Sequence, residues 1–166
     1  MIDKYIHTFE TDEFICKFRE ITWKEGLLID ALSFKNDENR TFFSSEFEKR
    51  EILNKAIIEI CDKSSKEVIK DNILESISYS CIEKIWEEYQ RFLHISANEA
   101  SYYYNCAKNY FDPNFTDKFP VPPEIIEVDF MLKGIVHLSK SEFDSLSVKD
   151  FEKIQLIIAV HNETKM

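Results

Sequence analysis

The amino-acid sequence predicts a mainly helical α+β fold, in which an N-terminal β-hairpin precedes a bundle of roughly five or six helices. Apolar residues alternate with period two only near the start of the chain, and recur every three or four positions in most later segments. Two glycines and four prolines among 166 residues are too few for the many turns of a β-sandwich. A length of 166 residues predicts one domain, with division into two small lobes as an alternative, and a hydrophobic content of 44% is enough for an apolar core.

The N-terminal hairpin is predicted from two short runs of strand-forming residues, which Thr11-Asp12 separates. The first run, residues 4–10, is rich in aromatic and β-branched side chains. In the second run, Phe14, Cys16 and Phe18 occupy alternate positions and therefore share one face of a strand. An isolated two-stranded hairpin is only marginally stable. Either the helical body or the sheet of another subunit is therefore expected to complete it, the latter by strand addition.

The first helix is predicted to begin at Thr22, which is followed three residues later by Glu25. This spacing is a capping box, in which each side chain satisfies a free backbone N–H group at the helix start. Apolar residues at helical spacing are expected to form a stripe that faces the core. The stripe consists of Trp23, Leu27, Leu28, Ala31 and Leu32. The polar residues 34–43 are predicted to form a loop.

The second helix is predicted to begin at another capping box, formed by Ser45 and Glu48. Apolar residues at helical spacing continue to about Asp62, so we expect the helix to extend that far. Two serines then interrupt the pattern. The following residues, 66–76, are compatible with either a short helix or a loop.

Two longer helices are predicted in the middle of the chain. The first begins near Ile77 and has a wide apolar face over about five turns. The second follows a capping box at Ser96 and ends at Asp112, before a proline. Because only a few residues join them, we expect the two helices to pack antiparallel as the folding core. Ile85 and Tyr104 are expected to face this core.

Residues 112–123 contain several prolines and are predicted to form an extended linker. Residues 1–111, before the linker, are expected to contain the hairpin and the helical core. Residues 124–166 are expected to form a C-terminal helical lobe that packs on this core, so that the chain remains one domain. Within the lobe, helices are predicted over about residues 124–138 and from Ser147 onward.

Composition argues against several classes of partner. The net charge of −10 repels phosphate backbones, so we expect no nucleic-acid partner. The N-terminus lacks a secretion signal, and the longest apolar run, Leu156 to Val160, is too short to span a membrane. We therefore expect no membrane partner. The cysteines lie in apolar segments without a CxxC pair, which predicts free, buried thiols in a reducing compartment.

The sequence contains no recognisable catalytic pattern. The four histidines lack the spacing of zinc or di-iron sites, and no glycine-rich phosphate loop or nucleophile elbow is present. Glu83 and Glu87 share a helix face, but a lone acidic face is usually solvated. We expect no catalytic residues, no metal, no cofactor and no small-molecule substrate. An enzyme of unrecognised type remains an alternative.

Aromatic residues are the candidates for protein contacts, because tyrosine and tryptophan are enriched in interfaces. The candidate residues are Phe18, Trp23, Tyr102 and Tyr103. Three consecutive tyrosines on a helix point about 100° apart, so residues 102–104 cannot form one platform. Core packing is the alternative role for each of these aromatic side chains.

The N-terminal segment resembles small proteins of tailed bacteriophages. A strand followed by Phe-Arg-x-Ile-Thr-Trp-x-Glu, a helix and a long helical region is similar to tail assembly chaperones and baseplate hub assembly proteins of T-even-like phages. The matching residues are Phe18, Arg19, Ile21, Thr22, Trp23 and Glu25.

This resemblance implies a non-catalytic structural or assembly component of a phage tail or baseplate, acting through protein–protein contacts. The implied partners are other tail or baseplate proteins, in an oligomer or hetero-assembly. The implied location is the cytoplasm of the bacterial host during assembly, or the virion. The alternative is an intracellular adaptor or regulatory protein that binds a host protein through an acidic helical surface.

Overall fold

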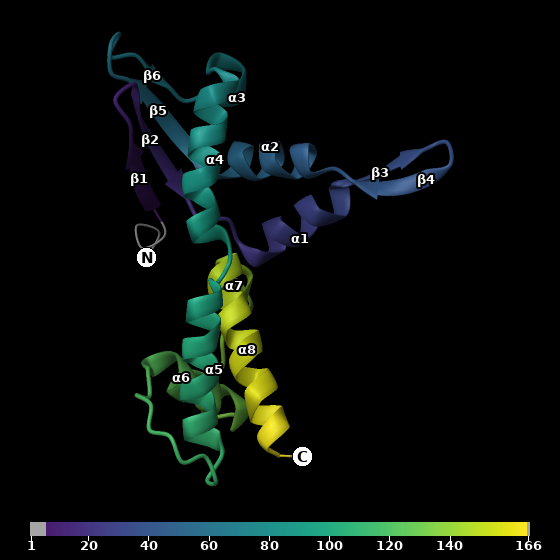
Figure 1. Ribbon diagram of the computed structural model, residues 1–166, viewed down its shortest axis with the longest axis vertical. Coiled ribbons are helices and arrows are strands. Elements are labelled where there is room, and N and C mark those ends of the chain that lie inside the picture. The colour runs from purple at the N-terminus through teal and green to yellow at the C-terminus, as the bar shows by residue number, and fades with distance from the viewer. Residues whose placement is uncertain (1–5, 166) are drawn as a thin grey trace. The chain divides into compact units, whose positions relative to one another are not determined.

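The computed structural model describes residues 6–165 of the chain (Figure 1). It is 55% helical and 18% strand, and it begins with a β-hairpin followed by several helices. The predicted mainly helical α+β class is thereby confirmed. The chain divides into two compact units, of which the N-terminal one ends at Leu93 and the C-terminal one begins at His94.

The N-terminal unit contains a four-stranded antiparallel sheet in the order β1-β2-β5-β6. Its strands are β1 (Ile6–Glu10), β2 (Phe14–Arg19), β5 (Ile57–Asp62) and β6 (Val68–Ile69). The first two strands form the predicted hairpin, although Lys4 and Tyr5 of the predicted run lie outside the described residues. The face of β2 that carries Phe14, Cys16 and Phe18 is buried. Because β2 pairs with both β1 and β5, a strand of the same chain extends the hairpin.

The predicted second helix is shorter than expected. Helix α2 (Ser45–Ala56) ends where strand β5 begins, and its N-cap is Ser44 rather than Ser45. The hydroxyl of Ser44 accepts a hydrogen bond from the backbone N–H of Phe47. The change to a strand occurs at a run of β-branched isoleucines, whose stiff side chains fit a strand that pairs with β2.

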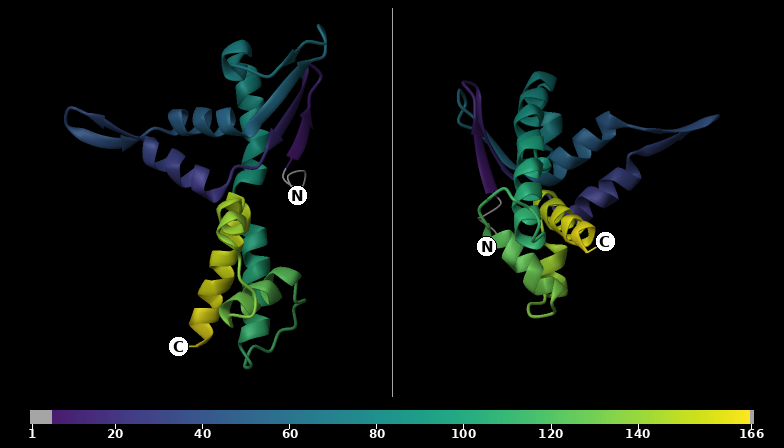
Figure 2. Two further views of the ribbon diagram at one scale, coloured as in Figure 1. Left: turned by 180° about the vertical axis from the view of Figure 1, so that it is seen from behind. Right: turned by 60° about the horizontal axis from the view of Figure 1, so that its bottom comes forward.

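A second hairpin occupies the segment predicted to be a loop. Its strands are β3 (Phe34–Asp37) and β4 (Arg40–Phe43), and it follows helix α1 (Trp23–Leu32) directly. Phe34 lies opposite Phe43, with ring centroids 5.3 Å apart. Such cross-strand aromatic pairs stabilise antiparallel ribbons. Within this unit, the hairpin extends from the ends of α1 and α2 that are distant from the four-stranded sheet (Figures 1 and 2).

Helix α4 (Tyr79–Leu93) covers one face of the four-stranded sheet, after the short helix α3 (Ile73–Ser76). Ile85 of α4 is fully buried, as expected. The ring of Phe18 contacts Tyr89 at 5.3 Å and Phe92 at 5.6 Å between centroids. These contacts join the helix to β2 and form the core of the N-terminal unit.

The C-terminal unit consists of α5 (Ala97–Phe111), α6 (Pro123–Leu132), α7 (Lys140–Asp144) and α8 (Val148–Thr164). Its core is built from α5, α6 and α8. The core residues are Cys106, Ala107, Ile125, Val128, Ile157 and Val160. Tyr104, which was expected to face the core, is instead 37% exposed.

The unit boundary differs from the one expected at residues 112–123. Helices α4 and α5 belong to different units, so the prediction that they pair as one folding core is wrong. Helix α5 packs against α8 instead, because Cys106 and Ala107 face the buried side chains of that helix. The segment 112–123 therefore connects two helices of the same unit. Among the described residues, no helix is both long and apolar enough to cross a membrane.

Candidate protein-contact surface

The predicted apolar stripe of α1 exists but faces solvent, so the expectation that it faces the core is wrong. Leu27 and Leu28 are each 58% exposed, and Leu32 is 50% exposed. The buried side chain of this helix is Ile29, on the opposite side. Helical periodicity identified which residues share a face, and the structure shows that this face is turned outward.

Polar contacts hold α1 in this orientation. The guanidinium of Arg19 donates two hydrogen bonds to the Glu25 carboxylate, at 2.9 and 2.7 Å. These bonds lower the pKa of Glu25 to about 2. Glu25 also completes the capping box predicted with Thr22. At the other end of the helix, the buried Ser33 donates its hydroxyl to the carbonyl of Ile29 at 2.6 Å. Glu25, Ile29 and Ser33 are spaced four residues apart and define the inner side of the helix.

The β3–β4 hairpin, which follows α1, also carries exposed apolar side chains. Phe34 is 57% exposed, and Phe42 and Phe43 are 41% and 42% exposed. The register places Phe34 and Phe43 on one face of the ribbon and Phe42, opposite Lys35, on the other. We call the six exposed side chains of the helix and the hairpin the α1–hairpin surface. Its residues are Leu27, Leu28, Leu32, Phe34, Phe42 and Phe43.

The α1–hairpin surface is comparable in area to the largest apolar patches of monomeric proteins. Phe42 lies on the other face of the ribbon, and the remaining five side chains expose on the order of 500 Å² together, since a large apolar side chain carries roughly 200 Å². The largest apolar patch on a typical monomer is about 300–600 Å² and is often functional. This surface therefore has the size expected of a protein-contact site.

The same segment is nearly neutral within an acidic chain. Residues 23–43 contain three basic and four acidic side chains, hence a net charge of −1, against −10 for the whole protein. One of the acidic groups, Glu25, is already paired with Arg19. A weakly charged apolar surface binds mainly by burial of apolar groups.

The predicted contact residue Phe18 is part of the core, which corrects its assignment to a contact site. Its side chain is buried between the interior strand β2 and helix α4. A strand that pairs on both sides and carries a helix on one face offers no exposed side chain on that face. Phe18 therefore stabilises the N-terminal unit and does not contact a partner.

The other predicted contact residues occupy different parts of the chain. Trp23 is half-buried at the first turn of α1, next to the exposed stripe. Tyr102 is exposed, and its ring meets the half-buried Tyr103 edge-on at 5.2 Å. Burial raises the pKa of Tyr103 to about 12, and its hydroxyl donates to Glu124 at 3.4 Å. The structure thus brings the two tyrosines together within the C-terminal unit.

The phenylalanines of the hairpin were missed by sequence reasoning. The segment 34–43 was predicted to be a loop because its centre is polar. The available signal was the symmetry of the segment, in which aromatic residues flank the polar centre, Asp37-Glu38-Asn39, on both sides. Aromatic residues on both sides of a short polar turn are typical of a hairpin.

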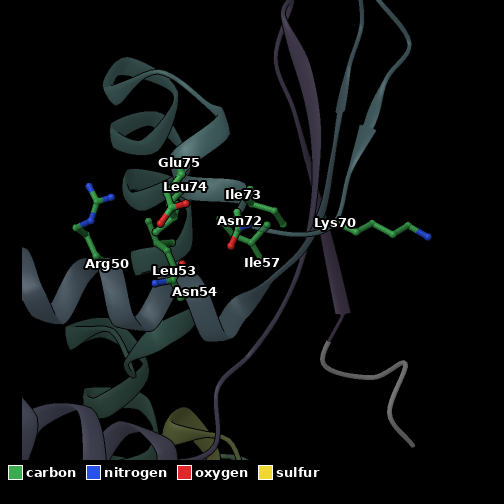
Figure 3. A pocket seen from close by; sticks show the side chains of 9 residues that line it. All are labelled: Arg50, Leu53, Asn54, Ile57, Lys70, Asn72, Ile73, Leu74 and Glu75. Atoms are coloured by element: carbon green, nitrogen blue, oxygen red, sulfur yellow. The ribbon is translucent and has the colours of Figure 1, made fainter.

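A pocket of about 290 Å³ lies between α2 and the segment that contains α3 (Figure 3). Leu53, Ile57 and Leu74 of its lining are buried core residues. Its polar lining side chains are exposed, and Figure 3 shows that Lys70 extends away from the others. Its volume is just below the range of about 300–1,000 Å³ for small-molecule sites. The pocket is an open depression of the N-terminal unit.

The chain contains residues that often form sites of other kinds. Within residues 6–165, no three histidine, cysteine, aspartate or glutamate side chains are grouped so that they could hold a metal ion. The four cysteines are free; Cys16 and Cys106 are buried, whereas Cys61 and Cys81 are half-buried. Comparisons with protein-family models, curated proteins and solved structures each found no match.

Proposed function

We propose that this protein is a non-catalytic assembly component that binds other proteins through the α1–hairpin surface. The observation that carries this proposal is the outward apolar face of α1, continued by the exposed phenylalanines of the hairpin. Full burial of one such side chain is worth about 1.5–3 kcal/mol. A chain that leaves six of them exposed on adjacent elements forgoes that stabilisation in the isolated molecule. A partner that covers the surface would recover it.

The specific form of the proposal is a component of a bacteriophage tail or baseplate. The resemblance to tail assembly chaperones and hub assembly proteins supports it. The residues of this resemblance form the end of β2 and the capping box of α1, including the pair of Arg19 with Glu25. These residues orient the helix that carries the exposed leucines. The proposed partners are other tail or baseplate proteins, in the host cytoplasm during assembly or in the virion.

Mass spectrometry of purified phage particles and of their assembly intermediates tests this form of the proposal. We expect the chain in at least one of these fractions, together with tail or baseplate proteins. Its absence from both would overturn the phage assignment. Recovery of one host protein in place of tail proteins would favour the adaptor alternative.

A matched pair of variants tests the surface itself. Leu27→Glu places a charge in the α1–hairpin surface, and Ile135→Glu makes the same change at a 64% exposed residue of the C-terminal unit. In affinity purification, Leu27→Glu should lose the partner, since a desolvated unpaired charge is costly in an apolar contact. Ile135→Glu should retain it. Equal retention by both variants would contradict the assignment of the surface.

A further inference from the structure

We propose that the α1–hairpin surface binds the same surface of a second copy of this chain, so that the protein forms a two-fold dimer. This inference rests on the proposed function, since it takes the surface to be a protein-contact site. Two-fold dimers are the commonest homo-oligomers, and their interfaces bring one patch of each copy together.

The area of the surface matches the requirement of such a dimer. Each copy contributes on the order of 500 Å² from its five side chains other than Phe42, since a large apolar side chain carries roughly 200 Å². Two copies together would bury on the order of 1,000 Å² of apolar side chain, and the polar rim of the contact brings the total to the lower end of the range of about 1,200–2,000 Å² for stable interfaces.

The distribution of charge also favours self-association at this place. Two chains that each carry a net charge of −10 repel one another over most of their surfaces. Residues 23–43 carry a net charge of only −1, so electrostatic repulsion between copies is small here. The segment also carries both signs of charge. In a two-fold contact, basic groups such as Lys35 and Arg40 can therefore face acidic groups such as Asp37 and Glu38 of the other copy.

The β3–β4 hairpin provides a third argument. In the described part of the chain, β3 and β4 pair with each other as a separate two-stranded sheet. A two-stranded ribbon is marginally stable alone. A two-fold axis perpendicular to an edge strand relates that strand to an antiparallel copy of itself, which allows backbone pairing across the axis. Such pairing would extend the ribbon to four strands and set Phe34 and Phe43 of the two copies side by side on its faces.

Sedimentation equilibrium of the full chain, together with native mass spectrometry, tests the proposal at concentrations of about 1–100 μM. We expect a dimer for the unmodified protein. Leu28→Glu and Phe34→Glu should each weaken association at least about 30-fold, as for a hot-spot residue of an interface. Ile135→Glu adds the same charge outside the surface and should leave the dimer intact. Circular dichroism checks that each variant is folded. If Leu28→Glu does not fold, the association of Phe34→Glu, on the hairpin, tests the dimer.

Two outcomes would overturn the dimer. One is a monomeric protein at about 100 μM, which would place any dimer dissociation constant above that value. The other is a dimer that Ile135→Glu disrupts while Leu28→Glu and Phe34→Glu do not. A monomer whose Leu27→Glu variant still loses its tail or baseplate partner would refute the dimer and leave the proposed function standing. A dimer that the surface variants disrupt, without any tail partner, would support the dimer and refute the phage assignment.

Discussion

The buried hydroxyl of Tyr89 joins helix α4 to the end of strand β2. It accepts a hydrogen bond from the backbone N–H of Ile21 at 3.0 Å and donates one to the carbonyl of Arg19 at 3.3 Å. Burial raises the pKa of this hydroxyl well above its ordinary value, so it stays protonated. The backbone N–H of Ile21 does not reach water easily at this site, since Ile21 is also buried. Tyr89 thus fixes the chain immediately before the capping box of α1.

Tyr89→Phe should destabilise the N-terminal unit by about 1–3 kcal/mol, because it leaves the buried N–H of Ile21 without its partner. Urea unfolding followed by circular dichroism measures this change. Tyr79→Phe is the matched control, since Tyr79 is 60% exposed and water can replace its hydroxyl. Equal stability of the two variants would contradict the role given to the Tyr89 hydroxyl.

The pair of Arg19 with Glu25 makes stability depend on pH. The pKa of Glu25 lies at about 2 in the folded protein and near 4.5 in the unfolded chain, so folding favours the charged carboxylate. Its contribution is therefore present above about pH 4.5 and is lost as the pH falls toward 2.

Glu25→Gln should cost about 1 kcal/mol at pH 7, a value reduced by partial solvent screening of the pair. Glutamine keeps the capping-box acceptor but removes the charge. The difference between Glu25→Gln and the unmodified protein should shrink between pH 4.5 and pH 2, as measured by denaturant unfolding at each pH. Glu87→Gln, on the exposed side of α4, serves as the control. A difference that stays constant down to pH 2 would argue against the pair.

At the scale of elements, the sequence predicted most helix starts but not which way each helix faces. The capping boxes at Thr22 and Ser96 are present, and Ser147 caps α8 as expected. Cap spacing is local, so the sequence alone reveals it. The orientation of α1 depends instead on the contacts of Glu25 with Arg19, which lies on a different element. The apolar periodicity of α1 predicts a core face because most apolar faces are buried.

Strand β5 was missed for a related reason. The run Ile57-Ile58-Glu59-Ile60 is compatible with both helical and strand periodicity when it is read alone. Its pairing with β2, which lies about forty residues earlier, decides between the two conformations. Long-range pairing of this kind has no signature in a local window of sequence. The four-stranded sheet was therefore predicted only as a hairpin.

The buried face of helix α4 was predicted correctly, and a substitution of Ile85 tests its packing. Ile85→Ala should cost about 2–5 kcal/mol, because Ile85 is fully buried and its truncation leaves a cavity. Thermal melting should show a clearly lower Tm for this variant. Glu87→Ala, on the exposed side of the same helix, should change the Tm little. A parental Tm for Ile85→Ala would mean that the packing between the helix and the sheet is wrongly assigned.

At the scale of the whole molecule, two units replace the single helical core that the sequence predicted. The prolines of residues 112–123 predict a domain boundary there, because stiff, extended segments often separate domains. The structure instead divides the chain between α4 and α5, where the sequence shows only a short helix–helix connection. Which helix packs on α5 depends on contacts with α8, about fifty residues later, and no local pattern encodes them.

The division predicts that the C-terminal unit folds alone. A fragment of residues 94–166 should be helical and melt cooperatively, because it contains a complete core of α5, α6 and α8. A fragment of residues 112–166, cut at the expected linker, lacks Cys106 and Ala107 of that core and should be largely unfolded. Circular dichroism and thermal melting compare the two. Similar melting of both fragments would contradict the division at residue 94 and favour a domain boundary at residues 112–123.

The outward leucines of α1 have a consequence for how contacts made by this protein respond to temperature. Removing apolar surface from water gives a negative change in heat capacity, and the attraction weakens as the solution is cooled. A contact through a segment with a net charge of −1 is also little affected by ionic strength. Any complex formed there is therefore expected to dissociate in the cold and to tolerate salt.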